Sequence, residues 1–317
     1  MSYSSAFLNA CSNSNLEVAK ELIQLYPSAV NLINDVNKAL QNACANDNIE
    51  VAKWLVRSYP SVVKISANGE EVFRYTCSNG HLEVAKWLVK LYPQINISAD
   101  DDFVFRYACS NGHLEVAKWL VQSYPSIVNT AAHSSSAFKN ACTNGYLEVA
   151  KWLVETYPSV VNISADDNYA FRSACAYGHL KVAKWLVKSY PCAINISAYH
   201  NSAFRLACKH GNLDVAKWLV ESYPSIVNVH DLNNYAFRNA CSNRHLEVAE
   251  WLVEIRPYCY VLELDPSQTQ ILEWKTRPIK EIRWLERSVP ILAYNSKTPN
   301  VFQMLNYDTM RHICEYV

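Results

Sequence analysis

The chain has 317 residues, of which 50% are hydrophobic and 18% are charged, a composition typical of folded and not of disordered proteins. Lysine plus arginine and aspartate plus glutamate number 29 each, so the basic excess of most nucleic-acid-binding proteins is absent and we expect no nucleic-acid partner. The opening residues MSYSSAFLNACSNS lack a basic segment followed by an apolar run, and no uncharged apolar stretch reaches about 18 residues. We therefore expect neither a signal peptide nor a membrane span.

A cysteine recurs at a nearly constant step through the first 257 residues. Successive steps are 33 residues, apart from one of 32, along Cys11, Cys44, Cys77, Cys109, Cys142, Cys175, Cys208 and Cys241. Ten residues after each of these cysteines stands a tryptophan, except in the first repeat, where Glu21 takes that position. A fixed period of this size predicts a stacked array of eight repeats. Eleven cysteines without a secretory signal indicate reduced thiols, so we expect a cytoplasmic protein.

The sixth repeat, residues 166–197, illustrates the elements of one unit. Its first three residues, Asp-Asp-Asn, favour a turn and supply candidate helix N-caps. A short apolar helix is predicted over about 169–176, where Gly178 then provides a left-handed stop. A second helix is predicted over about 180–190, ended by the proline that follows it. Because this second helix is apolar nearly all round, we expect neighbouring repeats to bury it on several sides.

The repeated phrase GHLEVAKWLV, at residues 80–89 and again at 112–121, resembles the Gly-His-x-x-Val-Val-x-x-Leu-Leu section of the ankyrin repeat, whose period is also the same. The family's Thr-Pro-Leu-His becomes Tyr-Ala-Phe-Arg at 169–172, and its second alanine becomes cysteine. The resemblance implies an all-α, ankyrin-type solenoid of about eight stacked helix-turn-helix repeats over residues 1–257. It also implies that turn tips and first helices form a concave binding face. The longer phrase CSNGHLEVAKWL resembles ankyrin arrays of large DNA viruses, which would place the protein in host cytoplasm.

The repeated cysteines and tryptophans are interpreted as packing residues. Equivalent helices of adjacent repeats lie about 8–10 Å apart, whereas a disulfide needs Cα atoms within about 7 Å. A ladder of disulfides is therefore excluded, and each cysteine is expected to be a small buried residue. The tryptophans are expected in the core, since each would bury a large apolar area.

Metal and cofactor sites are not expected. The chain contains no Cys-x-x-Cys pair, and its six glycines form no phosphate-binding loop. A histidine stands at the end of the turn in four repeats, at His81, His113 and His179 after a glycine and at His245 after Arg244, but asparagine or tyrosine occupies the same position elsewhere. The resemblance implies that this histidine ties the turn between the two helices through hydrogen bonds.

The residues that the repeat leaves variable are the candidates for binding. They are the turn before each first helix, the pair after each cysteine, and a basic residue that replaces the family's first-helix histidine; the resemblance places the first two on the concave face. We predict a partner-binding surface centred on repeats six to eight, formed by Asp102, Phe103, Tyr169, Arg172, Tyr177, Tyr199, Arg205, Lys209, His210 and Tyr235. Tyrosine and arginine are enriched among interface hot spots. Solvated turn tips that bind nothing are the alternative interpretation.

Residues 258–317 break the period and are predicted to form a helical C-terminal extension, with helices around 267–275 and 279–288. One interpretation is a cap over the last repeat, whose open face would otherwise expose apolar surface. The last residues, LNYDTMRHICEYV at 305–317, resemble the opening of an F-box. That resemblance implies contacts with a ubiquitin-ligase adaptor through Leu305, Asp308, Met310, Ile313 and Tyr316.

The expected function is that of a non-catalytic, monomeric scaffold that binds one partner protein, without metal or cofactor. A sharper alternative is a substrate receptor of a cullin-type ubiquitin ligase, docked through the F-box-like end. An enzyme is a third class, with His312 and Cys314 in the tail as its candidate residues. It is disfavoured because residues two apart on a helix point in different directions.

Overall fold

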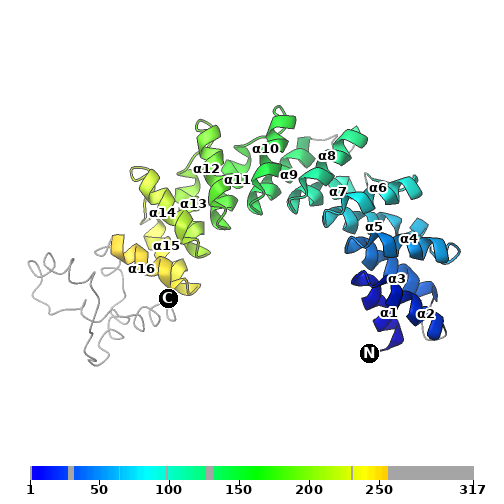
Figure 1. Ribbon diagram of the computed structural model, residues 1–317. Helices are drawn as coiled ribbons and strands as arrows, with labels where there is room; N and C mark the ends of the chain where they lie inside the picture. The colour runs from blue at the N-terminus through cyan, green and yellow to red at the C-terminus, as the bar shows by residue number, and fades with distance from the viewer. Residues whose placement is uncertain are drawn as a thin grey trace, which may run out of the picture. The chain divides into compact units, whose positions relative to one another are not determined.

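The computed structural model describes residues 2–27, 32–63, 65–97, 99–125, 131–229 and 231–255. These residues form sixteen α-helices and no strand, paired as the repeat pattern predicts (Figure 1). They divide into two compact units, with the boundary between Asn162 and Ile163. The predicted tail helices and the adaptor-binding candidates Leu305, Asp308, Met310, Ile313 and Tyr316 lie outside the described residues.

The first unit contains five helix pairs, which correspond to repeats one to five. Their bounds are α1 Tyr3–Ser12, α2 Leu16–Leu25, α3 Leu32–Ala45, α4 Ile49–Ser58, α5 Ile65–Ser78, α6 Leu82–Leu91, α7 Ala99–Ser110, α8 Leu114–Ser123, α9 Ala131–Thr143 and α10 Leu147–Thr156. The first helices of successive repeats pack against each other, α1 on α3 and so on to α9. Each second helix packs beside the first helix of its own repeat.

The second unit contains three helix pairs, which correspond to repeats six to eight. Their bounds are α11 Ala165–Ala176, α12 Leu180–Ser189, α13 Ala198–Lys209, α14 Leu213–Ser222, α15 Asp231–Ser242 and α16 Leu246–Ile255. Here α11, α13 and α15 form the inner row, and α12, α14 and α16 pack along one side of it (Figure 1). None of the described helices is long and apolar enough to cross a membrane.

The predicted ends of the two helices of the sixth repeat are confirmed, because residues next to each helix end determine them. Gly178 has a φ of 80°, which ends α11 and turns the chain into α12. The amide of Tyr190 closes the last helical turn on the carbonyl of Leu186 at 2.9 Å, and Pro191 then prevents a further turn.

The turn that precedes each first helix of the second unit differs from the predicted N-cap. Asp166, Asp167 and Asn168 all have left-handed backbone angles, with φ of 51°, 51° and 63°, so regular helix begins only at the next residue. The residue that precedes the helix, Ser164, makes no side-chain capping bond. The same left-handed stretch recurs at Tyr199–Asn201. Three successive non-glycine residues in this region are sterically unfavourable, at roughly 1–2 kcal/mol each, so other contacts must hold them.

Phenylalanines and cysteines of the first helices form the centre of each unit. Phe73, Phe138 and Phe171 are fully buried, as are all eight cysteines of the repeats. The cysteines are free thiols, as predicted. Burial raises the pKa of Cys11 and Cys44 to about 12, and it raises that of Cys175 as well.

The tryptophans are less buried than predicted. In α12 the buried side chains are Val182, Ala183 and Leu186, whereas Trp185 is half-buried. Its ring meets the ring of Tyr190 edge-on, with centroids 5.7 Å apart. A second edge contact joins repeats, as between Phe204 and Trp251 at 6.5 Å. The tryptophan therefore lies at the rim of the interface between neighbouring repeats, where it packs edge-on against other rings while part of its surface remains exposed.

Candidate partner-binding surface

One arginine holds each left-handed turn of the second unit. Arg172 donates from Nε to the carbonyl of Asp167 at 3.0 Å and from Nη2 to the carbonyl of Asp166 at 2.9 Å. Arg205 makes the equivalent pair of bonds at 2.7 Å each to the carbonyls of His200 and Tyr199. The planar guanidinium can serve two neighbouring carbonyls at once. Both arginines, predicted as partner-binding residues, are thus engaged by the backbone of their own repeat.

The same arginines stack on the turn of the following repeat. The guanidinium carbon of Arg172 lies 4.7 Å from the ring centre of Tyr199, and that of Arg205 lies 4.7 Å from the ring of Tyr235. A hydrogen bond to Asp167, together with the charge of that carboxylate, raises the pKa of the Tyr199 hydroxyl. These contacts link the turns of repeats six, seven and eight, although the Tyr199 side chain remains 55% exposed.

A buried polar side chain in the same turn provides a second link that sequence reasoning missed. Asn168 donates to the carbonyl of Ala193 at 2.7 Å and accepts from the amide of Asn195 at 2.9 Å. In the first unit, Asn37 and Ser135 also donate to a carbonyl 25 residues ahead. The sequence feature that indicates this link is a small amide or hydroxyl side chain that recurs at one position of the repeat.

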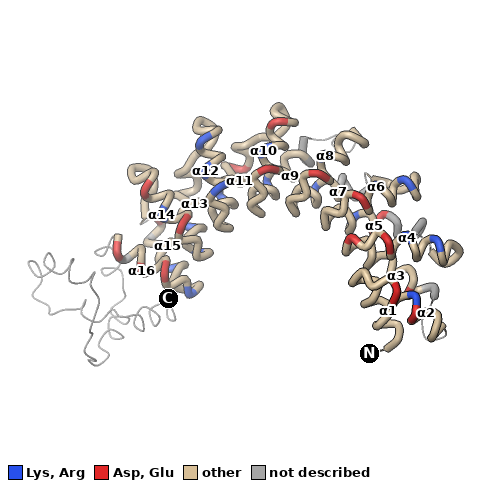
Figure 2. Tube along the Cα trace, in the orientation of Figure 1, with Lys and Arg blue, Asp and Glu red and all other residues tan. Residues whose placement is uncertain are grey.

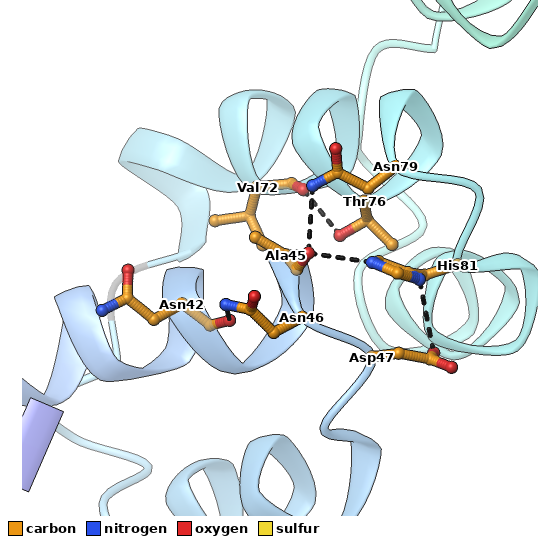
Figure 3. A network of polar contacts seen from close by, with 8 residues as sticks. All are labelled: Asn42, Ala45, Asn46, Asp47, Val72, Thr76, Asn79 and His81. Atoms are coloured by element: carbon orange, nitrogen blue, oxygen red, sulfur yellow. Dashed lines mark hydrogen bonds and ion pairs between the residues drawn. The ribbon is translucent and has the colours of Figure 1, made fainter. Parts of the chain in front are cut away.

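A ladder of polar contacts joins the ends of the first helices in the first unit (Figure 3). The carbonyl of Ala45 accepts from Asn79 Nδ2 at 2.9 Å and from His81 Nε2 at 2.8 Å. His81 Nδ1 lies 3.8 Å from a carboxylate oxygen of Asp47. Since a carbonyl only accepts, His81 must carry a proton on Nε2. The histidine therefore ties its turn to the interhelical turn of the preceding repeat.

The asparagine of this ladder is replaced in the second unit by two aromatic residues. Asn111 and Asn144 continue the ladder at 2.8 and 2.7 Å to carbonyls of the preceding repeat. Tyr177 and His210 occupy the equivalent positions of repeats six and seven, and their rings stack with centroids 5.8 Å apart and an interplanar angle of 25°. The Tyr177 side chain is 58% exposed. Burial, and then the charges of Lys209 and His245, lower the pKa of His210, which favours the neutral ring in the stack.

A separate aromatic cluster lies on α5 and α7 of the first unit. Phe103 stacks on Tyr107 with ring centroids 3.9 Å apart, and the guanidinium of Arg74 lies 5.3 Å from the Phe103 ring. Tyr107 and its equivalent in the preceding repeat, Tyr75, are 43% and 56% exposed. Neither tyrosine was predicted, although tyrosine occurs two residues before the cysteine only in these two repeats.

Comparison with known families identifies the repeat. A family model described as Ankyrin repeats (3 copies) matches the chain in overlapping segments at residues 7–101, 60–132, 105–198, 138–231 and 173–265. The chain belongs to the ankyrin-repeat family. No curated protein matches it.

The predicted site residues of this ankyrin-repeat chain fall into separate groups. One set of turn contacts joins Arg172, Tyr199, Arg205 and Tyr235; the stack joins Tyr177 and His210, with Lys209 beside it. Tyr169 begins the regular part of α11 with its side chain half-exposed. Phe103 belongs to the first unit, and the side chain of Asp102 lies outside what the structure describes. Among the described residues, no three metal-ligating side chains come together.

Proposed function

We propose that this ankyrin-repeat chain is a monomeric, non-catalytic scaffold, and that it binds a partner protein through the Tyr177–His210 surface. We define that surface as the stacked pair Tyr177 and His210 together with the adjacent Lys209. The observation that carries the proposal is that the stack replaces a structural hydrogen bond. Repeats three to five use asparagine there to bind a carbonyl of the preceding repeat, whereas Tyr177 presents a largely exposed ring.

An exposed aromatic ring that the fold does not require is suited to an interface. Tyrosine supplies a large contact area and is enriched at interface hot spots. The stack with His210 fixes the ring of Tyr177, so less side-chain freedom is lost on binding. Phe103, held between Arg74 and Tyr107 in the first unit, is a second candidate contact.

The chemistry of the repeated residues favours binding over catalysis. The repeat cysteines are buried, and burial raises the pKa of thiols such as that of Cys142, so that the reactive thiolate is scarce at neutral pH. His81 is engaged by the carbonyl of Ala45. A binding scaffold does not require the repeat cysteines or His81 to take part in a reaction.

The proposal is tested by restoring the residue that the other repeats carry. The variant Tyr177→Asn/His210→Asn is expected to keep the fold, because asparagine occupies this position in repeats one to five and eight. Peptides selected on the full chain from a displayed library would then be titrated against parent and variant by calorimetry. We expect at least a tenfold loss of affinity, the usual effect of removing a hot spot.

Tyr146→Asn serves as the matched control, since it removes a half-exposed tyrosine from the first unit at a position where Asn15 and Asn48 also occur. It should leave the affinity unchanged. Equal affinities of the parent and the double variant would refute the proposed surface.

A second proposal rests on the sequence of the tail. The likeness of residues 305–317 to an F-box opening favours a substrate receptor of a cullin-type ubiquitin ligase, located in the cytoplasm. A ligase adaptor should then co-purify with the full chain and be lost on deletion of residues 300–317. Retention of the adaptor after that deletion would contradict this function. A viral source, and with it host cytoplasm, rests on the phrase CSNGHLEVAKWL alone.

A further inference from the structure

The first turn of the second helix reverses its charge in one repeat only. Seven repeats place an acidic residue at the second position of this helix: Glu17, Glu50, Glu83, Glu115, Glu148, Asp214 and Glu247. The sixth repeat has Lys181 there. An acidic side chain at this position is favourable because it faces the positive end of the helix dipole, whereas a lysine is not. Lys181 therefore has no local structural advantage.

The reversal also removes an ion pair. In the first five repeats the glutamate pairs with the lysine three residues later, at N–O distances of 2.6 to 3.0 Å. In the sixth repeat Lys184 has no such glutamate, and its amino group lies 5.9 Å from the ring centre of Trp218. Helix α12 thus carries Lys181, Lys184 and Lys188 with no acidic residue (Figure 2).

The segments that join the first and second helices of each repeat show a similar change in net charge between the two units. Counted with neutral histidine, the five segments of the first unit, 12–17, 45–50, 78–83, 110–115 and 143–148, each have a net charge of −1 or −2. The three of the second unit, 176–181, 209–214 and 242–247, have net charges of +1, 0 and 0. The difference comes from Lys181, Lys209 and Arg244, which stand at positions that are uncharged or acidic in the first unit.

These three cations are available to a ligand. Lys181 and Arg244 are exposed and Lys209 is half-buried. Within the described part of the chain none of them makes an ion pair, in contrast to the glutamate-paired lysines of the first unit. Lys181 stands four residues after Tyr177, in the first turn of α12 beyond the turn at Gly178, and Lys209 directly precedes His210. The exposed stack is therefore flanked by unpaired positive charge.

We infer that the Tyr177–His210 surface binds an acidic segment of the partner protein. Carboxylates of that segment pair with Lys181 and Lys209, and one of its apolar side chains packs on the ring of Tyr177. The inference rests on the proposed function and adds the chemical class of the ligand. Like-charged partners would be rejected by the same lysines, so charge sets specificity as well as affinity.

Three synthetic peptides of equal length test the inference on the full chain. Each contains one tyrosine and one leucine, flanked by glutamate and aspartate, by glutamine and asparagine, or by lysine and arginine. Binding would be measured by fluorescence anisotropy at low and at physiological salt. We expect the acidic peptide to bind at least about tenfold more tightly than the neutral one, with the difference shrinking as salt screens the charges.

The matched variant is Lys181→Glu/Lys209→Ser, which installs the residues common in the other repeats and restores a glutamate for Lys184. It should fold normally, as checked by its thermal unfolding, and should lose at least about tenfold in affinity for the acidic peptide. Lys90→Glu, a charge reversal at an exposed position on α6 of the first unit, should bind as the parent does.

Several outcomes would overturn the inference. Equal affinity for the acidic and neutral peptides removes the role of charge, and so does an unchanged affinity of the double variant. Tighter binding of a single-stranded oligonucleotide of the same formal charge would assign the surface to nucleic acid instead. If library-selected peptides without acidic residues bind in a Tyr177-dependent manner, the proposed function stands and the inference fails. If no binding depends on Tyr177, both fail.

Discussion

At the scale of single residues, Arg172 illustrates how one side chain can hold an unfavourable backbone. Its two hydrogen bonds fix the carbonyls of Asp166 and Asp167 within the left-handed turn, and its guanidinium also covers Tyr199. The side chain therefore acts within its own turn and between two repeats. Arg205 has the same two roles in repeat seven, and Arg238 donates to the Leu232 carbonyl of its own turn at 3.1 Å.

Substitution of Arg172 tests this role. Arg172→Ala should lower the free energy of unfolding by about 1–3 kcal/mol, because two hydrogen bonds to a charged donor are lost. Arg172→Lys should recover only part of this, since an ammonium group lacks the planar fork. Urea unfolding, monitored by tryptophan fluorescence, measures the free energy of unfolding of both variants. Arg57→Ala, at an exposed position on α4, is the control, and an equal loss there would argue against a specific clamp.

Cys192 is the exposed exception to the buried cysteines of the repeats. It lies in the turn after α12, whereas Cys175 and Cys208 are fully buried in the same unit. Brief alkylation of the native chain, followed by peptide mass mapping, should modify Cys192 and leave Cys175 and Cys208 unmodified. Modification of all three at similar rates would contradict the buried positions.

At the scale of elements, the polar ladder makes stability depend on pH. Burial lowers the pKa of His113, opposed by its hydrogen bond to the Ser78 carbonyl and reinforced by the charge of His81. A histidine whose pKa is lower in the folded chain binds protons more readily when unfolded. Its contribution to stability is therefore present above the unfolded pKa of about 6.5 and is lost as the pH falls below it.

His113→Asn provides the test, since Asn48 and Asn212 occupy the same position in other repeats and make the inter-repeat bond. The urea midpoint of the parent should fall between pH 8 and pH 5, and the variant should show a shallower decline. An identical pH profile for the two chains would show that this histidine is not coupled to folding.

Helix pairs could be predicted from the sequence because their signals are local. Gly178 and Pro191 mark the ends of α11 and α12 wherever the rest of the chain lies. The contacts of Arg172 and Asn168 could not be predicted in this way, because their partners are set by backbone angles and by residues 25 or more positions away. The extent of tryptophan burial was overestimated, since hydrophobicity indicates that a ring is covered but not which edge remains in solvent. The pair Tyr177 and His210 was found because it departs from the repeat.

At the scale of the whole molecule, stability is distributed over units that contact only their neighbours. A terminal repeat has one neighbour and should open at lower denaturant than an internal one. In the first unit, Cys11 of repeat one should therefore become reactive to alkylating reagents at a lower urea concentration than Cys77 of repeat three. Both are fully buried in the native chain. Simultaneous exposure of the two thiols would indicate that the unit unfolds in one step.

The polar ladder also bears on how such a chain changes its length. In the first unit, repeats three to five each have an asparagine at the same position. Its Nδ2 donates to a main-chain carbonyl of the preceding repeat. Removal or duplication of one of these repeats should therefore leave a junction with a matching donor and acceptor. Recombination between copies, such as the identical residues 79–89 and 111–121, would then leave these contacts between repeats unchanged. Repeats six and seven are the exception: their stacked rings match only each other, so neither can be exchanged without losing the pair.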